Sequence, residues 1–380
     1  MYSLLFRDHG LSTTAISSLF IIWSVASFVL EVPSGAWADL VDRRLLLVVS
    51  APISATGFAT WILWPTYPGF ALGFVLWGLS GALMSGTFEA LLYDELATRH
   101  ATGAYAGLFG WANAGAMAAN LTATALAAPL YSWGGYELVA WISVAVALVH
   151  GLLAWSLPAA PRVDDVDETA QFDGSGSFAH RYVEMLRSGI TEATRQRPVR
   201  HLVVIGAALY GLTAYDEYFG LVATEAGAAT DQVALLVALT VAGQLAGTAL
   251  AGRTATLPRR AMTVVVVSSG ALIAVGALAG HPLGFVAIAV GYGLTENAVV
   301  VADAKLQDAI SGRARATVTS LSGFSAEVVA VVIFAAIAVG SSWLAVSTLL
   351  AIATLPVLGI AAAVRFWWPE PISGGRVRGS

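Results

Sequence analysis

Long apolar stretches recur along the whole chain, and no feature limits its possible folds more. A helix needs about 20 apolar residues to cross the roughly 30 Å hydrocarbon core of a bilayer. Eleven stretches of this kind cover residues 13–38, 45–64, 70–95, 104–130, 138–157, 201–222, 232–251, 261–279, 283–306, 316–339 and 343–367. Only 11% of the residues are charged, against about a quarter in soluble domains. The chain is therefore predicted to be an all-α polytopic membrane protein.

The basic residues predict the orientation of these helices. If the loop at 41–44 is cytoplasmic, alternation places every Lys and Arg except Arg7 at the cytoplasmic face. Such an asymmetry is the positive-inside pattern of multi-pass membrane proteins. We therefore expect a protein of the plasma membrane whose C-terminal tail, residues 369–380, lies in the cytoplasm.

Residues 158–200 form the one clearly polar stretch between apolar runs. The first part of this linker is acidic and rich in Gly and Ser, which predicts flexibility. The second part predicts an amphipathic helix on the cytoplasmic side, because apolar residues recur at helical spacing: Phe178, Tyr182, Met185, Leu186 and Ile190. The linker separates an N-terminal bundle, residues 1–157, from a six-helix bundle, residues 201–368.

The two bundles are related by an internal repeat. A shift of 217 residues pairs Asp8 with Glu225, and Arg43 with Arg260, while a shift of 209 pairs Asp94 with Asp303. Two such halves joined by a linker are typical of transporters that bind substrate between the halves. With this register, residues 201–217 have no counterpart in the first half. We therefore expect eleven complete helices of a 12-helix plan, the first being mostly missing. A misplaced start codon and a genuine shortening both explain this gap.

Small residues are frequent in the predicted helices. Gly243 and Gly247 are four residues apart, so they lie on one face of the helix at 232–251. This spacing predicts a close contact with a neighbouring helix.

The loop after the first complete helix carries a motif, Gly35-Ala-Trp-Ala-Asp39-Leu-Val-Asp-Arg43-Arg44. It resembles the signature of the major facilitator superfamily, Gly-x-Leu-Ala-Asp-Arg-x-Gly-Arg-Arg. Three positions depart from that signature and reduce the basic charge of the loop: Trp37, Leu40 and Asp42. The resemblance extends over the whole chain through the number of segments, the central linker and the repeat. It implies two pseudo-symmetric helix bundles that rock about a shared pocket.

The same resemblance suggests a role for charges at the cytoplasmic helix ends. In the family, the corresponding residues pair across loops and hold the inner face closed. Here this gate would comprise Gly35, Asp39, Arg43, Arg44, Asp94, Arg260 and Asp303. Simple topology charges at the membrane edge are the alternative interpretation.

Acidic residues inside the bilayer are functional candidates because burying a charge there is costly. Five lie deep within predicted helices: Glu89, Asp216, Glu217, Glu296 and Glu327. Each could exchange protons during transport or bind a cationic substrate. A structural hydrogen bond is the alternative for any one of them. Asp216 and Glu217 are adjacent, so at most one can face a cavity directly.

These observations favour a proton-coupled secondary transporter that exports hydrophobic or cationic compounds. Uptake of a metabolite and a non-transporting membrane sensor or scaffold remain alternatives. An enzyme is not expected, because the sequence lacks His-Glu-x-x-His, Gly-x-Ser-x-Gly and a phosphate-binding Gly-rich loop. We expect no catalytic residues, metal site or cofactor, with the proton gradient as the energy source. The expected partners are the bilayer and a small solute, with no nucleic acid, and the protein is expected to be a monomer.

Overall fold

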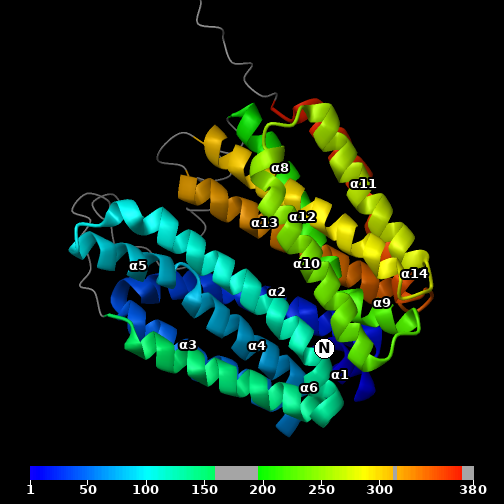
Figure 1. Cartoon of the computed structure of the whole chain (residues 1–380), viewed down its shortest axis with the longest axis horizontal. Helices are drawn as coiled ribbons and strands as arrows, with labels where there is room; N and C mark the ends of the chain where they lie inside the picture. Colours follow the sequence, from blue (N-terminus) through cyan, green and yellow to red (C-terminus); the bar gives the residue numbers. More distant parts are fainter. Residues whose placement is uncertain (159–195, 311–314, 370–380) are drawn as a thin grey trace, which may run out of the picture. The chain divides into compact units, whose positions relative to one another are not determined.

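The computed structural model describes residues 1–158, 196–310 and 315–369, and this part of the chain is helical without a β-strand (Figure 1). The predicted amphipathic helix of the linker and most of the C-terminal tail lie outside the described residues. Within the described part, nine helices are long and apolar enough to cross a membrane. The predicted all-α membrane fold is therefore confirmed.

The first half contains α1 (Tyr2–Asp8), α2 (Thr13–Leu40), α3 (Arg43–Leu63), α4 (Tyr67–Met84), α5 (Thr87–Thr98), a short 3-10 helix (Thr102–Ala104) and α6 (Tyr105–Ser156). Asp42 begins α3, because its Oδ1 accepts a hydrogen bond from the Leu45 N–H at 3.1 Å. This acid departs from the family signature, and its N-cap gives a structural reason for it. The predicted run at 70–95 bends at Gly86, whose φ of +69° separates α4 from α5.

Two predicted segments, 104–130 and 138–157, both fall within α6. They meet at Gly134 and Gly135, where the backbone is not helical. Gly135 has φ +61° and ψ −159°, a conformation that is essentially restricted to glycine. The chain therefore reverses direction between two spanning segments at this point, although both segments carry the single label α6.

The second half contains α8 (Arg197–Leu212), the 3-10 helix η3 (Thr213–Tyr218), α9 (Phe219–Glu225), α10 (Thr230–Thr254), α11 (Arg259–Leu278), α12 (Gly284–Ala309), α13 (Arg315–Gly340), α14 (Val346–Ala353) and α15 (Pro356–Trp367). The expectation of one continuous helix over 201–222 is wrong, because η3 interrupts it. The run at 343–367 also divides, before Pro356, whose ring supplies no N–H to a continuing helix.

The described helices form two compact units. The first unit holds α1 to α6 together with Thr230–Leu235 and Phe334–Ser342, and its core contains fully buried phenylalanines on α1, α2 and α4: Phe6, Phe20, Phe70 and Phe74. The second unit holds α8, η3, α9, α11, α12, α14, α15 and most of α10 and α13. Within it α11 and α12 pack side by side, and α12 also packs against α8 (Figure 1).

Candidate functional site

The most polar part of the second unit's interior lies on α12. Tyr292, Thr295, Glu296 and Asn297 are all buried, and each makes a hydrogen bond to another segment of the same unit. Residues 292–297 span about one and a half helical turns, and their side chains reach two neighbours of α12. Tyr292 and Thr295 bond to η3, whereas Glu296 and Asn297 bond to α10.

On the η3 side, a carboxyl group meets two aromatic hydroxyls. The Tyr292 hydroxyl donates to Asp216 Oδ2 at 2.7 Å. The Tyr215 hydroxyl lies 3.3 Å from Thr295 Oγ1, where either atom can donate. Both aromatic rings are almost completely buried. The 3-10 geometry of η3 positions these two neighbours, because its tighter winding rotates Tyr215 and Asp216 relative to the α8 register.

On the α10 side, a second carboxyl group is paired with an amide. Gln244 Nε2 donates to Glu296 Oε1 at 2.9 Å, and only 8% of Glu296 is exposed. Asn297 Nδ2 donates to the Gly247 carbonyl oxygen at 2.9 Å, while its Oδ1 accepts from the Thr254 hydroxyl at 2.9 Å. These bonds satisfy the polar groups that α12 buries against α10.

The backbones of α10 and α12 come unusually close at two glycines. A Cβ atom on Gly243 would lie well under 3.0 Å from the Ala289 carbonyl oxygen. A Cβ atom on Gly247 would lie equally close to the Gly293 carbonyl oxygen. Neither position can hold a side chain without separating the helices. The predicted small-residue contact at Gly243 and Gly247 is therefore confirmed, and it brings Gln244 within reach of Glu296.

The structure thus places two of the five predicted acids at α12: Glu296 belongs to this helix, and Asp216 of η3 bonds to it through Tyr292. Tyr292 links them, since it hydrogen-bonds Asp216 and lies one turn before Glu296 on α12. Glu217 and Glu327 are half-buried elsewhere in the second unit, on η3 and α13. Glu89 is half-buried in the first turn of α5 in the first unit.

The predicted gate residues are also distributed over both units. Arg43, in the first turn of α3, forms an ion pair with Asp94 of α5, and Asp94 is only 6% exposed. Arg44 donates to the Leu157 carbonyl oxygen at 3.2 Å and lies over the Trp155 ring. Asp303 and Arg260 are exposed in the second unit. The surroundings of Gly35 and the side chain of Asp39 fall outside the described part of the structure.

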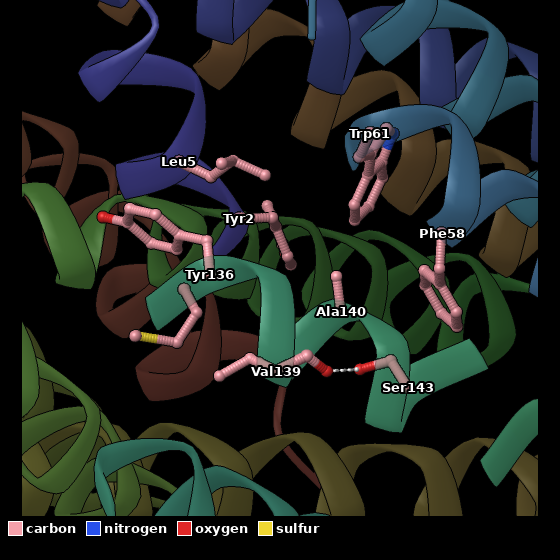
Figure 2. Close-up of a pocket in the computed structure, with 9 residues that line it drawn as sticks. Tyr2, Leu5, Phe58, Trp61, Tyr136, Val139, Ala140 and Ser143 are labelled. Atoms are coloured by element: carbon pink, nitrogen blue, oxygen red, sulfur yellow. Dashed lines mark hydrogen bonds between the residues drawn. The ribbon is translucent and has the colours of Figure 1, made fainter. Parts of the chain in front are cut away.

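The first unit contains a different kind of pocket, between α1, α3 and α6 (Figure 2). Its volume is about 140 Å³, and its walls are formed by Tyr2, Leu5, Phe58, Trp61, Val139 and Ala140. Two polar groups beside it are already paired. Ser143 Oγ donates to the Val139 carbonyl oxygen at 2.9 Å, and the Tyr136 hydroxyl donates to Asp8 at 2.7 Å. This pocket therefore offers apolar contacts to a ligand, and its two polar side chains already have hydrogen-bond partners.

Sequence reasoning missed Tyr292, Thr295 and Thr254. Tyr292 had a usable signal, because it lies four residues before Glu296 on the same helix, and residues at this spacing are neighbours on the helix surface. Thr295 had no such signal, since adjacent residues point in different directions. Thr254 had none, since its partner Asn297 is 43 residues away in the sequence. Among the described residues, no group of three or more His, Asp or Glu side chains could hold a metal ion.

Long apolar helices of this number define a polytopic membrane protein. The sequence matches the model of the Major Facilitator Superfamily over residues 1–335. The chain belongs to this superfamily, and it is a secondary transporter rather than an enzyme.

Solved structures show the same fold. The nucleoside transporter NupG superposes with a TM-score of 0.66 at 13% identity, covering 95% of this chain and 91% of that one. A bacterial homologue of the human lysosomal transporter Spinster, in an inward-facing and unoccupied conformation, gives a TM-score of 0.61 at 16% identity, covering 96% and 92%. No match is found among curated proteins.

Proposed function

We propose that this transporter exchanges protons for a small solute by alternating access, and that it exports hydrophobic or cationic compounds across the plasma membrane. The observation that carries the proposal is the pair of hydrogen-bonded carboxyl groups on α12 and η3, Glu296 and Asp216. A carboxyl group in a dry interior binds its proton more tightly than one in water. A change in water access during the transport cycle would therefore load and release protons.

The partners of these acids suit either protonation state. The Gln244 amide donates to a carboxylate through Nε2, and after rotation its oxygen can accept from a carboxylic acid. The Tyr292 hydroxyl can likewise donate or accept. Neither form of these two carboxyl groups would then lack a partner, and an unpaired group as buried as Glu296 would cost about 1–3 kcal/mol. Low cost in both states is what reversible proton exchange requires.

The ion pair of Arg43 with Asp94 is proposed as part of a gate, together with Gly35, Asp39, Arg44, Arg260 and Asp303. Such pairs bias a two-state equilibrium when their stability differs between the states. The C-terminus is proposed to face the cytoplasm. No cofactor and no second subunit are required by this mechanism.

The test is flux in proteoliposomes with an imposed proton gradient. Glu296→Gln and Asp216→Asn should each abolish uphill, proton-driven flux while leaving solute exchange at equal concentrations largely intact. The matched control is Asp231→Asn, because Asp231 is an exposed carboxylate in the first turn of α10. Uphill flux that survives in the double variant Glu296→Gln/Asp216→Asn would refute proton coupling by these groups.

Uptake of a metabolite is the second candidate, and the fold similarity to a nucleoside transporter favours including nucleosides in the compound panel. The direction of solute flux relative to proton flux distinguishes export from uptake. Export predicts solute movement against the proton flow, whereas proton-driven uptake predicts movement with it.

A further inference from the structure

We infer that a pocket between α8, α12 and α13 binds a small organic cation, with Asp303 as its anionic anchor and Tyr210 as its aromatic wall. The pocket has a volume of about 320 Å³, at the lower end of the range for small-molecule sites. All of its walls belong to the second unit, and they include Gly206, Tyr210, Asp303, Thr319, Ser322 and Gly323. The inference names a substrate class for the proposed transport function and rests on it for its biological role.

Asp303 has little to neutralise it within the described structure. Its carboxylate accepts a long hydrogen bond, 3.4 Å, from Gln307 Nε2, whose other contact is the Thr319 hydroxyl at 3.1 Å. Among the described side chains, no Lys, Arg or His lies within salt-bridge distance of this carboxylate. The nearest basic residue along α12, Lys305, instead lies over the Trp368 ring, 5.5 Å from its centroid. A bound cation would supply the missing opposite charge.

The remaining walls favour an organic cation over a metal ion. One carboxylate with hydroxyl neighbours falls short of the six or more oxygens that Ca²⁺ takes and of the octahedral set that Mg²⁺ demands. The Tyr210 side chain, on a residue that is 55% exposed, offers an aromatic face, and aromatic faces attract ammonium groups. Thr319 and Ser322 add two hydroxyl-bearing side chains to the pocket wall.

Two glycines keep the pocket open. A Cβ atom on Gly323 would meet nothing within 4 Å, and one on Gly206 would meet only the Ser322 hydroxyl at 3.9 Å. Their helices therefore do not need glycine for close packing, in contrast to Gly243 and Gly247. The absence of side chains at these two positions leaves space for a ligand.

Asp303 lies on the same face of α12 as Tyr292 and Glu296. At 100° per residue, Tyr292, Glu296 and Asp303 lie within about 40° of one another around the helix axis. Asp303 is seven residues beyond Glu296, a rise of roughly 10 Å. A cation held at Asp303 would therefore lie close enough to Glu296 to compete electrostatically with a proton there, which is the linkage that exchange transport needs.

The experiment measures equilibrium binding of benzyltrimethylammonium and of N,N-dimethylbenzamide, a neutral compound of similar size, to the full chain in detergent by calorimetry. The wild type should bind the cation at least about tenfold more tightly than the neutral compound, a difference of about 1.4 kcal/mol. Asp303→Asn should remove this preference. The control Asp308→Asn should retain it, because Asp308 is an exposed carboxylate on the same helix outside the pocket.

Gly323→Val should weaken both probes by filling the space, and the unfolding temperature of each variant establishes that it is folded. Equal binding of the cation by the wild type and a folded Asp303→Asn variant would overturn the inference. Because neither Glu296 nor Asp216 lines the pocket, Glu296→Gln and Asp216→Asn should still bind the cation. Failure of proton coupling and failure of this site are therefore separate results.

Discussion

Asp8 and Glu225 have the same role in the two halves of the chain. Asp8 ends α1 and accepts a hydrogen bond from the Tyr136 hydroxyl, just after the turn at Gly135. Glu225 ends α9 and accepts from the backbone N–H groups of Val346 and Ser347, at 2.9 and 2.8 Å. Each carboxylate thus connects the end of an early helix of its half of the chain to the start of the last helix of that half.

Glu225 caps the N-terminus of α14, so its removal should destabilise the second unit. Two N–H groups at the start of a helix lose their acceptor in Glu225→Ala, at a cost of about 0.5–2 kcal/mol. We expect a lower unfolding temperature in detergent. The exposed Glu137 provides the control. If Glu137→Ala and Glu225→Ala unfold at the same temperature, the cap contributes nothing.

The turn inside α6 should require glycine at position 135. A Cβ atom on Gly135 would meet nothing within 4 Å, so Gly135→Ala tests the backbone conformation alone. The expected cost is about 1–3 kcal/mol. Gly110→Ala is the matched control, because Gly110 is helical within α6 and also has open space around it. That control should be neutral or stabilising, and a neutral Gly135→Ala would contradict the turn.

The contact between α10 and α12 should not tolerate a methyl group. Gly247→Ala would place a carbon far inside the contact radius of the Gly293 carbonyl oxygen, and we expect a loss of about 1–3 kcal/mol from the resulting helix displacement. Gly252→Ala, on the same helix with open space around it, should unfold at or above the wild-type temperature. Equal effects of the two substitutions would rule out the close approach.

The ion pair of Arg43 with Asp94 should depend on the pairing and not on either charge alone. Arg43→Ala leaves a nearly buried carboxylate without its main partner, and we expect a loss of about 1.5–3 kcal/mol. The exchanged pair Arg43→Asp/Asp94→Arg should recover part of this loss. Arg99→Ala is the control, since Arg99 pairs with Glu95 on the surface, where such pairs contribute about 0–1 kcal/mol. Exchange without any recovery would argue against direct pairing.

The sequence allowed the membrane class, the superfamily and one close helix contact to be predicted, because these depend on sequence patterns. Apolar length alone identified the spanning segments, and the four-residue spacing of Gly243 and Gly247 predicted a helix contact. Intramembrane charge identified Asp216 and Glu296 as candidates. For the spanning segments, the glycine contact and the acids, the physical constraint acts within one helix, whereas the superfamily was indicated by the loop motif together with the number and order of segments.

The remaining features depend on contacts between segments that are distant in the sequence. Tyr292 reaches Asp216 across 76 residues, and no periodicity in either helix encodes this pairing. The 3-10 helix at Thr213–Tyr218 contains neither Pro nor Gly, so the break in the predicted helix has no local signal. The pocket at Asp303 likewise requires three helices to be placed before it can be recognised.

The glycine contacts between α10 and α12 limit how the second unit can move. Two backbones in direct contact have no intervening side chains whose rotamers could adjust as one helix slides past the other. We therefore expect α10 and α12 to move together as one rigid unit during the transport cycle. The distance between Gln244 and Glu296 would then stay constant, while the hydration and the protonation of Glu296 would differ between the two end conformations.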